Sequence, residues 1–374
     1  MTRQVRFDHG PLAGGTLFSS PQSVIRADTI AGIVPAFAAM EAARARGYWL
    51  AGYCSYELGY ALNPRLEPLM PPRRDTPLIM MGVFDHPRAA PSLPPPAGRI
   101  TDPQPLWTRE RYDQALRQVH DYIEAGDTYQ INLTFPMEAR ASGDPLALYA
   151  ALAARQPVGE GAFVDLGGPI ILSRSPELFF AVDETGRIET RPMKGTIGRG
   201  DNAAQDHAAK EALLASEKDR AENLMIVDLL RNDISRVCLA GTVQVPRLFE
   251  IETYATLHQM TSTVTGQLAP RTGLIDIIAA LFPCGSITGA PKIRAMEIIA
   301  ELEQEPRGVY CGAIGWMDPG GPMRFSVAIR TPVLHDEGRL QLNVGGGITH
   351  DSRAQSEWEE ALCKSAFLNL SSLG

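Results

Sequence analysis

The spacing of apolar residues predicts two kinds of element in this chain, short strands and amphipathic helices. Apolar, β-branched and aromatic runs bounded by turn residues are typical of strands. Such runs cover 48–62, 78–84, 129–137, 161–165, 170–173, 178–182, 188–193, 242–268, 312–316, 324–330 and 340–344. Apolar residues that recur every three or four positions, as in a helix, cover 33–46, 108–125, 145–154, 207–238, 273–281, 291–302 and 352–370. Because strands and helices come in runs rather than in strict alternation, the pattern predicts an α+β fold with mixed or antiparallel sheets.

One segment interrupts this pattern. Residues 86–105 are dominated by proline and alanine. Such a segment cannot continue a helix or a central strand, so we expect an exposed connection. The next helix has a clear start, because Thr108 can cap its first turn. No Gly-x-Gly-x-x-Gly follows a first strand, which argues against a dinucleotide-binding domain.

Composition and charge narrow the function classes. The chain has 374 residues, of which 44% are hydrophobic and 21% charged, as in ordinary globular proteins. The formal net charge of −8 and the absence of a long basic run disfavour a nucleic-acid partner. No apolar run approaches a membrane span, and the first residues lack a signal-peptide core. The five cysteines are widely spaced without a Cys-x-x-Cys pair, which favours a reduced, cytoplasmic setting over a disulfide framework or a zinc site.

A lysine flanked by conformationally special residues is the first candidate for chemistry. Pro192 fixes its own φ angle and Gly195 permits a positive one. A stiff approach followed by a permissive residue predicts a turn that presents Lys194 at a defined place. The alternative is a surface turn with a solvated lysine.

Carboxylates near the end of the chain form a second candidate. Glu357 and Glu360 are three residues apart in the last predicted helix, so they share one face. Glu222, at the start of an apolar helical stretch, supplies a third carboxylate. Together they could hold a hard cation such as Mg²⁺. The alternative is solvated helix faces, with Glu360 paired to Lys364.

Two glycine-rich segments and two isolated polar residues complete the set. The predicted turn at 344–348 has three consecutive glycines, whose N–H groups could cradle a carboxylate or phosphate. The segment 285–292 is similarly small and ends at a helix start. Arg330, at a strand end, could bind a carboxylate with two hydrogen bonds. His258 stands alone, which is more typical of a packed than of a catalytic histidine.

Seven ordered blocks between 173 and 368 resemble the chorismate-utilising enzymes, a family that includes anthranilate, aminodeoxychorismate, isochorismate and salicylate synthases. The blocks are Ser-Arg-Ser-Pro-Glu (173–177), Arg-Pro-Met-Lys-Gly-Thr (191–196), Ser-Glu-Lys-Asp-Arg-Ala-Glu-Asn (216–223) with Asp-Leu-Leu-Arg-Asn-Asp (228–233), Leu-His-Gln-Met-Thr-Ser (257–262), Gly-Ser-Ile-Thr-Gly-Ala-Pro-Lys (285–292), Arg-Gly-Val-Tyr-Cys-Gly-Ala-Ile-Gly (307–315), and Gly-Gly-Gly-Ile (345–348) with Glu-Trp-Glu-Glu (357–360). The first third matches loosely, chiefly at 126–133.

The resemblance implies an α/β/β/α sandwich of two sheets flanked by helices. Residues 1–105 would form its N-terminal part and residues 106–374 its chorismate-binding catalytic region. Two departures from the family pattern are Cys284, where glycine is expected, and Gly346, where alanine is usual.

Within the family, Lys194 resembles the aminodeoxychorismate synthases, since anthranilate synthases generally have alanine at this place. Residues 17–20 also read Leu-Phe-Ser-Ser instead of the Leu-Leu-Glu-Ser feedback motif. The implied reaction aminates chorismate at C4, for para-aminobenzoate and folate synthesis. Lys194 would be the nucleophile and Glu177 the acid.

The resemblance also implies the remaining site residues. Mg²⁺ would be held by Glu222, Glu357 and Glu360. The substrate would be bound by Gly195, Thr196, His258, Thr288, Tyr310, Arg330, Gly345, Gly346, Gly347 and Lys364. No glutaminase nucleophile occurs in a Gly-x-Cys-x-Gly context, so a separate glutamine amidotransferase is expected to supply ammonia. The alternatives are an anthranilate or isochorismate synthase, or a non-catalytic carboxylate-binding subunit.

Overall fold

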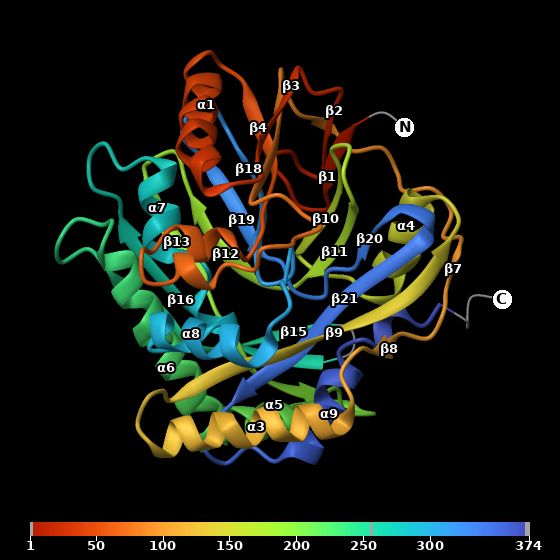
Figure 1. Cartoon of the computed structure of the whole chain (residues 1–374), viewed down its shortest axis with the longest axis vertical. Helices are drawn as coiled ribbons and strands as arrows, with labels where there is room; N and C mark the ends of the chain where they lie inside the picture. Colours follow the sequence, from red (N-terminus) through yellow and green to blue (C-terminus); the bar gives the residue numbers. More distant parts are fainter. Residues whose placement is uncertain (1–2, 255–256, 371–374) are drawn as a thin grey trace.

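A computed structural model describes residues 3–254 and 257–370, and two large antiparallel sheets form its frame (Figure 1). The first sheet has the order β17 (Gly289–Ala290), β9 (Gln130–Ser142), β21 (Arg339–Ile348), β20 (Val333–Leu334), β11 (Ile170–Ser175), β10 (Glu160–Asp165), β1 (Gln4–Phe7), β2 (Thr16–Ser19) and β6 (Arg88–Ala89), with β7 (Arg99–Ile100) and β8 (Gln104–Pro105) beside β9. The second has the order β14 (Met193–Gly198), β16 (Leu257–Gln267), β13 (Arg187–Arg191), β12 (Leu178–Val182), β19 (Met323–Val327), β18 (Ala313–Met317), β4 (Trp49–Cys54), β5 (Ile79–Phe84) and β3 (Ser23–Ala27), with β15 (Gln244–Thr253) beside β16.

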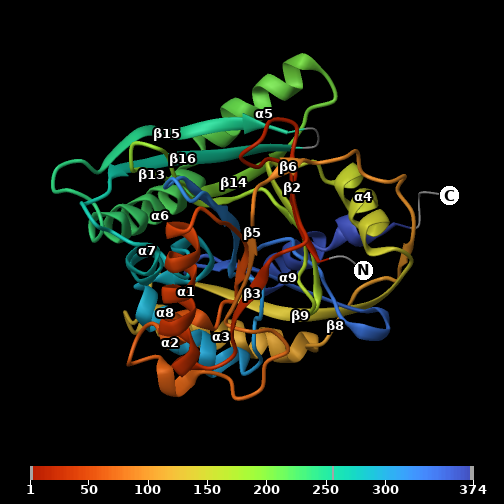
Figure 2. The same ribbon diagram turned by 90° about the horizontal axis from the view of Figure 1, so that it is seen from above.

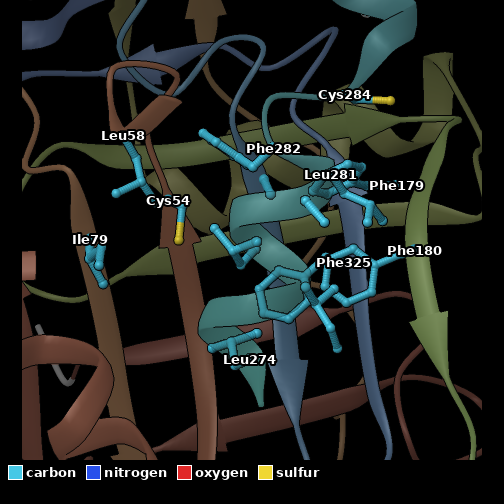
Figure 3. Close-up of a cluster of buried hydrophobic side chains, with 14 of the residues drawn as sticks. Cys54, Leu58, Ile79, Phe179, Phe180, Leu274, Leu281, Phe282, Cys284 and Phe325 are labelled. Atoms are coloured by element: carbon cyan, nitrogen blue, oxygen red, sulfur yellow. The ribbon is translucent and has the colours of Figure 1, made fainter. Parts of the chain in front are cut away.

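Three apolar cores show that these sheets are the middle layers of a four-layer sandwich. One core joins β1, β2 and β10 of the first sheet to β4, β5 and β18 of the second. A second core packs α1 (Ile33–Ala45), α2 (Leu58–Ala61), α6 (Glu217–Ser235) and α7 (Leu274–Leu281) on the second sheet, and Figure 3 shows Leu274 and Leu281 against Phe180 and Phe325. The third packs α3 (Arg109–Glu124), α4 (Pro145–Arg155), α8 (Lys292–Glu303) and α9 (Ala354–Cys363) on the first sheet.

The inner strands explain the long apolar runs of the sequence. Along β5, Ile79 and Met81 belong to the helix-covered core, whereas Met80 and Phe84 belong to the core between the sheets. Successive side chains of a strand point to opposite faces, so a strand buried on both faces is apolar throughout. The predicted α+β class with antiparallel sheets is therefore confirmed, and so is the sandwich that the resemblance implies.

Most predicted elements are present, and three predictions differ from the structure. The strand expected over 48–62 is wrong in its second half, because β4 ends at Cys54 and Leu58–Ala61 form helix α2. The predicted cap is present, since Thr108 Oγ1 accepts a hydrogen bond from the Arg111 N–H. The long helix expected over 207–238 is wrong. It is two helices, α5 (Ala203–Ala215) and α6, because Ser216 is extended and caps the second through the Asp219 N–H. The closing helix ends at Cys363, and a single 3₁₀ turn follows it.

The N-terminal third contributes strands to both sheets, and the division at residue 105 stays a prediction. Its proline-rich part runs along the surface with three two-residue strands. Among the described residues, none of the helices has the length and apolar character that crossing a bilayer requires. From above (Figure 2), β14 and β16 run alongside α6.

Candidate active site

The three glycines expected in a turn lie instead inside strand β21, so that prediction is wrong. Gly345, Gly346 and Gly347 pair with Thr134, Leu133 and Asn132 of β9. A Cβ at Gly345 would clash with the Leu133 carbonyl, so this close pairing requires glycine. Cross-strand pairing over 131–140 of β9 thus overrides the turn tendency of a glycine run.

Two of the three glycine amides are nevertheless open to a ligand. The N–H groups of Asn132 and Thr134 point away from β21, toward the Thr288 carbonyl and the Glu303 carboxylate. In an antiparallel pair of strands, the N–H groups of the opposite residues Gly347 and Gly345 then also point away from β9. The only strand on that side, among the described residues, pairs with β21 no further than Gln341.

Lys194 reaches the same place from the second sheet. It lies on strand β14 rather than in the turn that its sequence predicts, and Gly195 after it has φ +84° at a register shift against β16. The Lys194 Nζ would be 3.2 Å from a Cβ at Gly347, so the glycine leaves room for the amine. Burial, assisted by the charge of Lys364, lowers the pKa of Lys194, although Glu222, Glu177 and Glu360 oppose this. The structure therefore favours an amine that loses its proton more readily than a surface lysine.

Glu177 provides a buried carboxyl near this amine. Glu177 lies between β11 and β12 and is only 3% exposed. Its carboxyl group accepts a 2.7 Å hydrogen bond from Ser286 Oγ. Burial raises the pKa of Glu177 to about 7, against the opposing effects of Ser286, Lys194 and Arg330. A carboxyl with this pKa is partly protonated near neutral pH and can act as an acid.

Helix α9 brings two of the predicted metal ligands to Gly346. Glu357 Oε2 and Lys364 Nζ would each lie 3.4 Å from a Cβ at Gly346, an ordinary contact distance, so the alanine usual in the family would also fit. Lys364 Nζ contacts Glu360 Oε1 at 2.8 Å and donates to the Gly345 carbonyl at 2.8 Å. Burial acts to raise the pKa of Glu360, but Lys364, Lys194 and Lys218 together outweigh burial, and the net shift is downward.

Glu222 completes the acidic set from helix α6. Burial raises its pKa, Lys194 opposes the rise, and the negative charge of Glu357 adds to it, so the two helices influence each other across the site. Carboxylates from two helices suit the donor chemistry of a hard cation. In the part of the chain that the structure describes, however, no three acidic, His or Cys side chains lie close enough together to hold a metal ion as they stand. The magnesium set therefore stays a prediction.

Three predicted substrate-binding side chains are engaged within the protein. Thr288 is fully buried and donates to the Cys284 carbonyl at 3.1 Å. Thr196 donates to Gln259 Oε1 at 3.0 Å, and Gln259 in turn donates to the Gly195 carbonyl at 2.8 Å. His258 is buried on β16 as its isolation predicts.

Both ring nitrogens of His258 already have partners. Nε2 is 2.9 Å from Asp206 Oδ1 and Nδ1 is 3.0 Å from Thr253 Oγ1. These contacts fix the ring between helix α5 and strand β15. A role for His258 toward a substrate stays a prediction.

Arg330 and Tyr310 differ in availability. Arg330 has φ +49°, which is unusual for an arginine. Among the described residues, no acceptor forms a hydrogen bond or ion pair with its guanidinium. Burial lowers its pKa, while Tyr254 and Glu177 counteract that effect. Tyr310 is buried, and burial raises its pKa. Among the predicted substrate-binding residues that the structure describes, Arg330 is therefore the positively charged side chain without a partner in the protein.

Two amides that sequence reasoning did not select also face this place. Gln130 is 0% exposed, and neither polar atom of its side-chain amide has a partner. A Cβ at Gly347 would clash with this amide. Asn132, two residues on and hence on the same face of β9, has an unpartnered Nδ2. Polar residues at alternate positions of an otherwise apolar strand were the available signal, since buried amides normally have partners.

Comparison with known proteins gives a consistent result. Residues 84–369 match the family model described as chorismate binding enzyme. The chain is 44% identical over 264 residues to aminodeoxychorismate synthase component 1 of Escherichia coli (strain K12), which covers 71% of this chain and 58% of that protein. It is 44% identical over 254 residues to aminodeoxychorismate synthase of Streptomyces pristinaespiralis, covering 68% of this chain and 35% of that protein. The chain thus spans between a third and three fifths of these relatives.

Solved structures agree on the fold. Anthranilate synthase component I from Streptococcus pneumoniae TIGR4 superimposes with a TM-score of 0.78 at 26% identity, covering 98% of this chain and 92% of that one. The menaquinone-specific isochorismate synthase from Escherichia coli gives 0.76 at 16% identity, covering 98% and 87%. The sandwich is therefore shared with proteins whose sequences have diverged widely.

Proposed function

The chain belongs to the family of chorismate binding enzymes, and on this basis we propose that it converts chorismate and ammonia to 4-amino-4-deoxychorismate. The observation that carries the proposal is the position of the Lys194 amine. It lies beside Gly347 of strand β21, close enough to the buried Glu177 for the two charges to interact. The relatives named aminodeoxychorismate synthase, at 44% identity, support the same reaction.

Substrate binding must neutralise two carboxylates. The unpaired Arg330 guanidinium, Tyr310 and the open amides of Gly345 and Gly347 are suited to the enolpyruvyl carboxylate. The ring carboxylate would lie on the side of helix α9. There Glu222, Glu357 and Glu360 would hold Mg²⁺, which would supply positive charge to that carboxylate and draw the three acids together.

In the first step, the neutral amine of Lys194 attacks C2 of the ring. The ring double bonds shift, the C4–O bond breaks, and Glu177 gives its proton to the departing oxygen, which leaves as water. The resulting Glu177 carboxylate takes up the proton that the alkylated amine loses. Burial favours both starting forms, the neutral lysine and the protonated acid.

In the second step, ammonia attacks C4 and the double bonds shift back. The C2–N bond breaks, and the departing lysine amine takes up the proton that the new C4 ammonium loses. One unfavourable displacement is thereby divided into two, which is the advantage of covalent catalysis.

Ammonia is proposed to come from a glutamine amidotransferase partner. The name component 1 of the E. coli relative implies a second component there. The setting we propose is cytoplasmic, where the product would serve para-aminobenzoate and folate synthesis.

Product analysis tests the proposal. Incubation with chorismate and Mg²⁺ should yield 4-amino-4-deoxychorismate only when ammonium is added. A fluorescent aromatic amine would indicate anthranilate synthase instead, an activity suggested by the 39% identity to that component of Aquifex aeolicus. Isochorismate formed without ammonium, or unchanged chorismate, would refute the assignment in favour of the other two alternatives.

A further inference from the structure

A buried arginine outside the predicted site holds two of the main-chain segments that line it. Arg307, 3% exposed, lies between α8 and β18. Its guanidinium donates to the Asn132 carbonyl at 2.7 Å and to the Ile287 carbonyl at 2.9 Å. These two carbonyls belong to different parts of the sequence and meet at this one side chain.

The arginine is itself held from every side. Both Glu303 carboxylate oxygens accept from it, at 2.6 and 2.8 Å, and the Tyr56 ring lies 4.6 Å from the guanidinium carbon. Glu303 Oε1 also accepts from the N–H and hydroxyl of Thr134. Glu57 Oε1 accepts from the main-chain N–H of Arg307 at 2.8 Å, which fixes the backbone of this residue. The guanidinium therefore has little freedom to move.

Both held segments carry groups of the candidate site. Asn132 lies two residues from Gln130 and pairs with Gly347. Ile287 lies between Ser286, which donates to Glu177, and the buried Thr288. A buried ion pair of this kind is often no more stabilising than an apolar pair of similar volume, so stability alone does not account for it.

We propose that Arg307 is a positioning residue, which locks the Asn132 segment against the Ile287 segment and so sets the width of the substrate site on that side. The inference rests on the proposed function, because its readout is the reaction with chorismate. Lys194 belongs to β14, outside both segments, so Arg307 affects substrate binding more than the nucleophile.

The test compares Arg307→Lys with Arg44→Lys. Lysine can still pair with Glu303 but cannot bond both carbonyls in the plane of a guanidinium. Arg44 is matched, because it binds the carbonyls of Asp318 and Gly321 and pairs with Glu41. In Figure 1 its helix α1 lies at the top and α9 at the bottom.

We expect Arg307→Lys to raise the chorismate KM at least about tenfold while kcat falls less than about threefold, and Arg44→Lys to change neither more than about twofold. Equal KM in Arg307→Lys and wild type overturns the inference. Wild type that leaves chorismate unchanged refutes the proposed function instead, so the two failures are distinct.

Chemical rescue provides the second measurement. Arg307 and Tyr56 line a cavity of about 320 Å³, so Arg307→Ala should leave a space that guanidinium ion can enter. Millimolar guanidinium should lower the KM of Arg307→Ala toward that of wild type, and urea should not. Failure of rescue in a folded variant counts against the inference. If Arg307→Ala does not fold, Tyr56→Leu replaces it, and an unchanged KM in that variant overturns the inference.

Discussion

Two buried strand pairs, β4–β5 and β9–β21, differ in whether they contain buried polar side chains without hydrogen-bond partners. Along β4–β5 every described side chain packs in an apolar core, and the Tyr53 hydroxyl is placed 3.5 Å from Met80 Sδ. Along β9–β21, Gln130 and Asn132 are as deeply placed but leave amide atoms without partners. Unpartnered buried amides cost free energy, so their concentration opposite Lys194 indicates that this pair is arranged for a ligand rather than for stability.

The largest change should follow removal of the amine that faces β21. Lys194→Ala should lower kcat for C4 amination roughly 1,000-fold, the scale of losing a nucleophile. Intact-protein mass spectrometry after mixing with chorismate should show an adduct in wild type and in the control Lys210→Ala, but none in Lys194→Ala. An adduct of equal mass and yield in all three proteins would remove Lys194 from this role.

A smaller loss is expected on the acidic side of the site. Glu360→Gln should lower kcat/KM roughly 100-fold and flatten its dependence on Mg²⁺ concentration, because an amide oxygen is a weaker ligand than a carboxylate. The exposed neighbour Glu359→Gln is the control on the same helix and should leave the magnesium titration unchanged. Identical titration curves for wild type and Glu360→Gln would contradict the metal assignment.

Adjacent glycines of β21 offer an internal comparison. An alanine methyl at 347 would meet the Gln130 amide and lie 3.2 Å from Lys194 Nζ, whereas one at 346 would make ordinary contacts. Gly347→Ala should therefore lower kcat/KM roughly tenfold, and Gly346→Ala less than about twofold. Similar kinetics for the two variants would show that space beside Lys194 is not what the glycines provide.

The acid role of Glu177 predicts a pH dependence. If the protonated form acts, kcat should fall as the pH rises through about 7, the pKa to which burial raises Glu177. The Ser286 hydrogen bond favours the charged form and lowers that pKa. Ser286→Ala should thus move the fall of kcat to higher pH, which a pH–rate profile measures. A profile that stays in place, or moves to lower pH, would exclude Glu177 as the acid.

A substitution in the apolar strand pair β4–β5 should change stability but not the kinetics of the reaction with chorismate. Met81→Ala in β5 removes a fully buried side chain and should lower the free energy of unfolding by about 2–5 kcal/mol. Chorismate KM should stay unchanged at a temperature where the variant is folded. A raised KM would show that the two strand pairs are not functionally separate.

The class of fold could be predicted from the sequence because a strand that is buried on both faces is apolar at every position, as in the run 78–84. Local sequence pattern selected Lys194 and the three acids as candidates, whereas their roles and Glu177 came from the family resemblance. That these residues lie near one another could not be derived from spacing alone. The glycines of β21 were misplaced because a glycine run resembles a turn until its partner strand is known. The break between α5 and α6 at Ser216 was not predicted. Its capping role depends on the directions of the two helices that it connects, which the sequence does not show.

Pairing between β9 and β21 has a consequence for biosynthesis. Asn132 pairs with Gly347 although residues 133–346 separate them in the sequence, and contacts of such long range form slowly. A ribosome must therefore release the chain as far as β21 before Gly345, Gly346 and Gly347 can pair with β9. Until then the edge of β9 that faces β21 is unpaired, and unpaired strand edges are the kind of surface that chaperones shield.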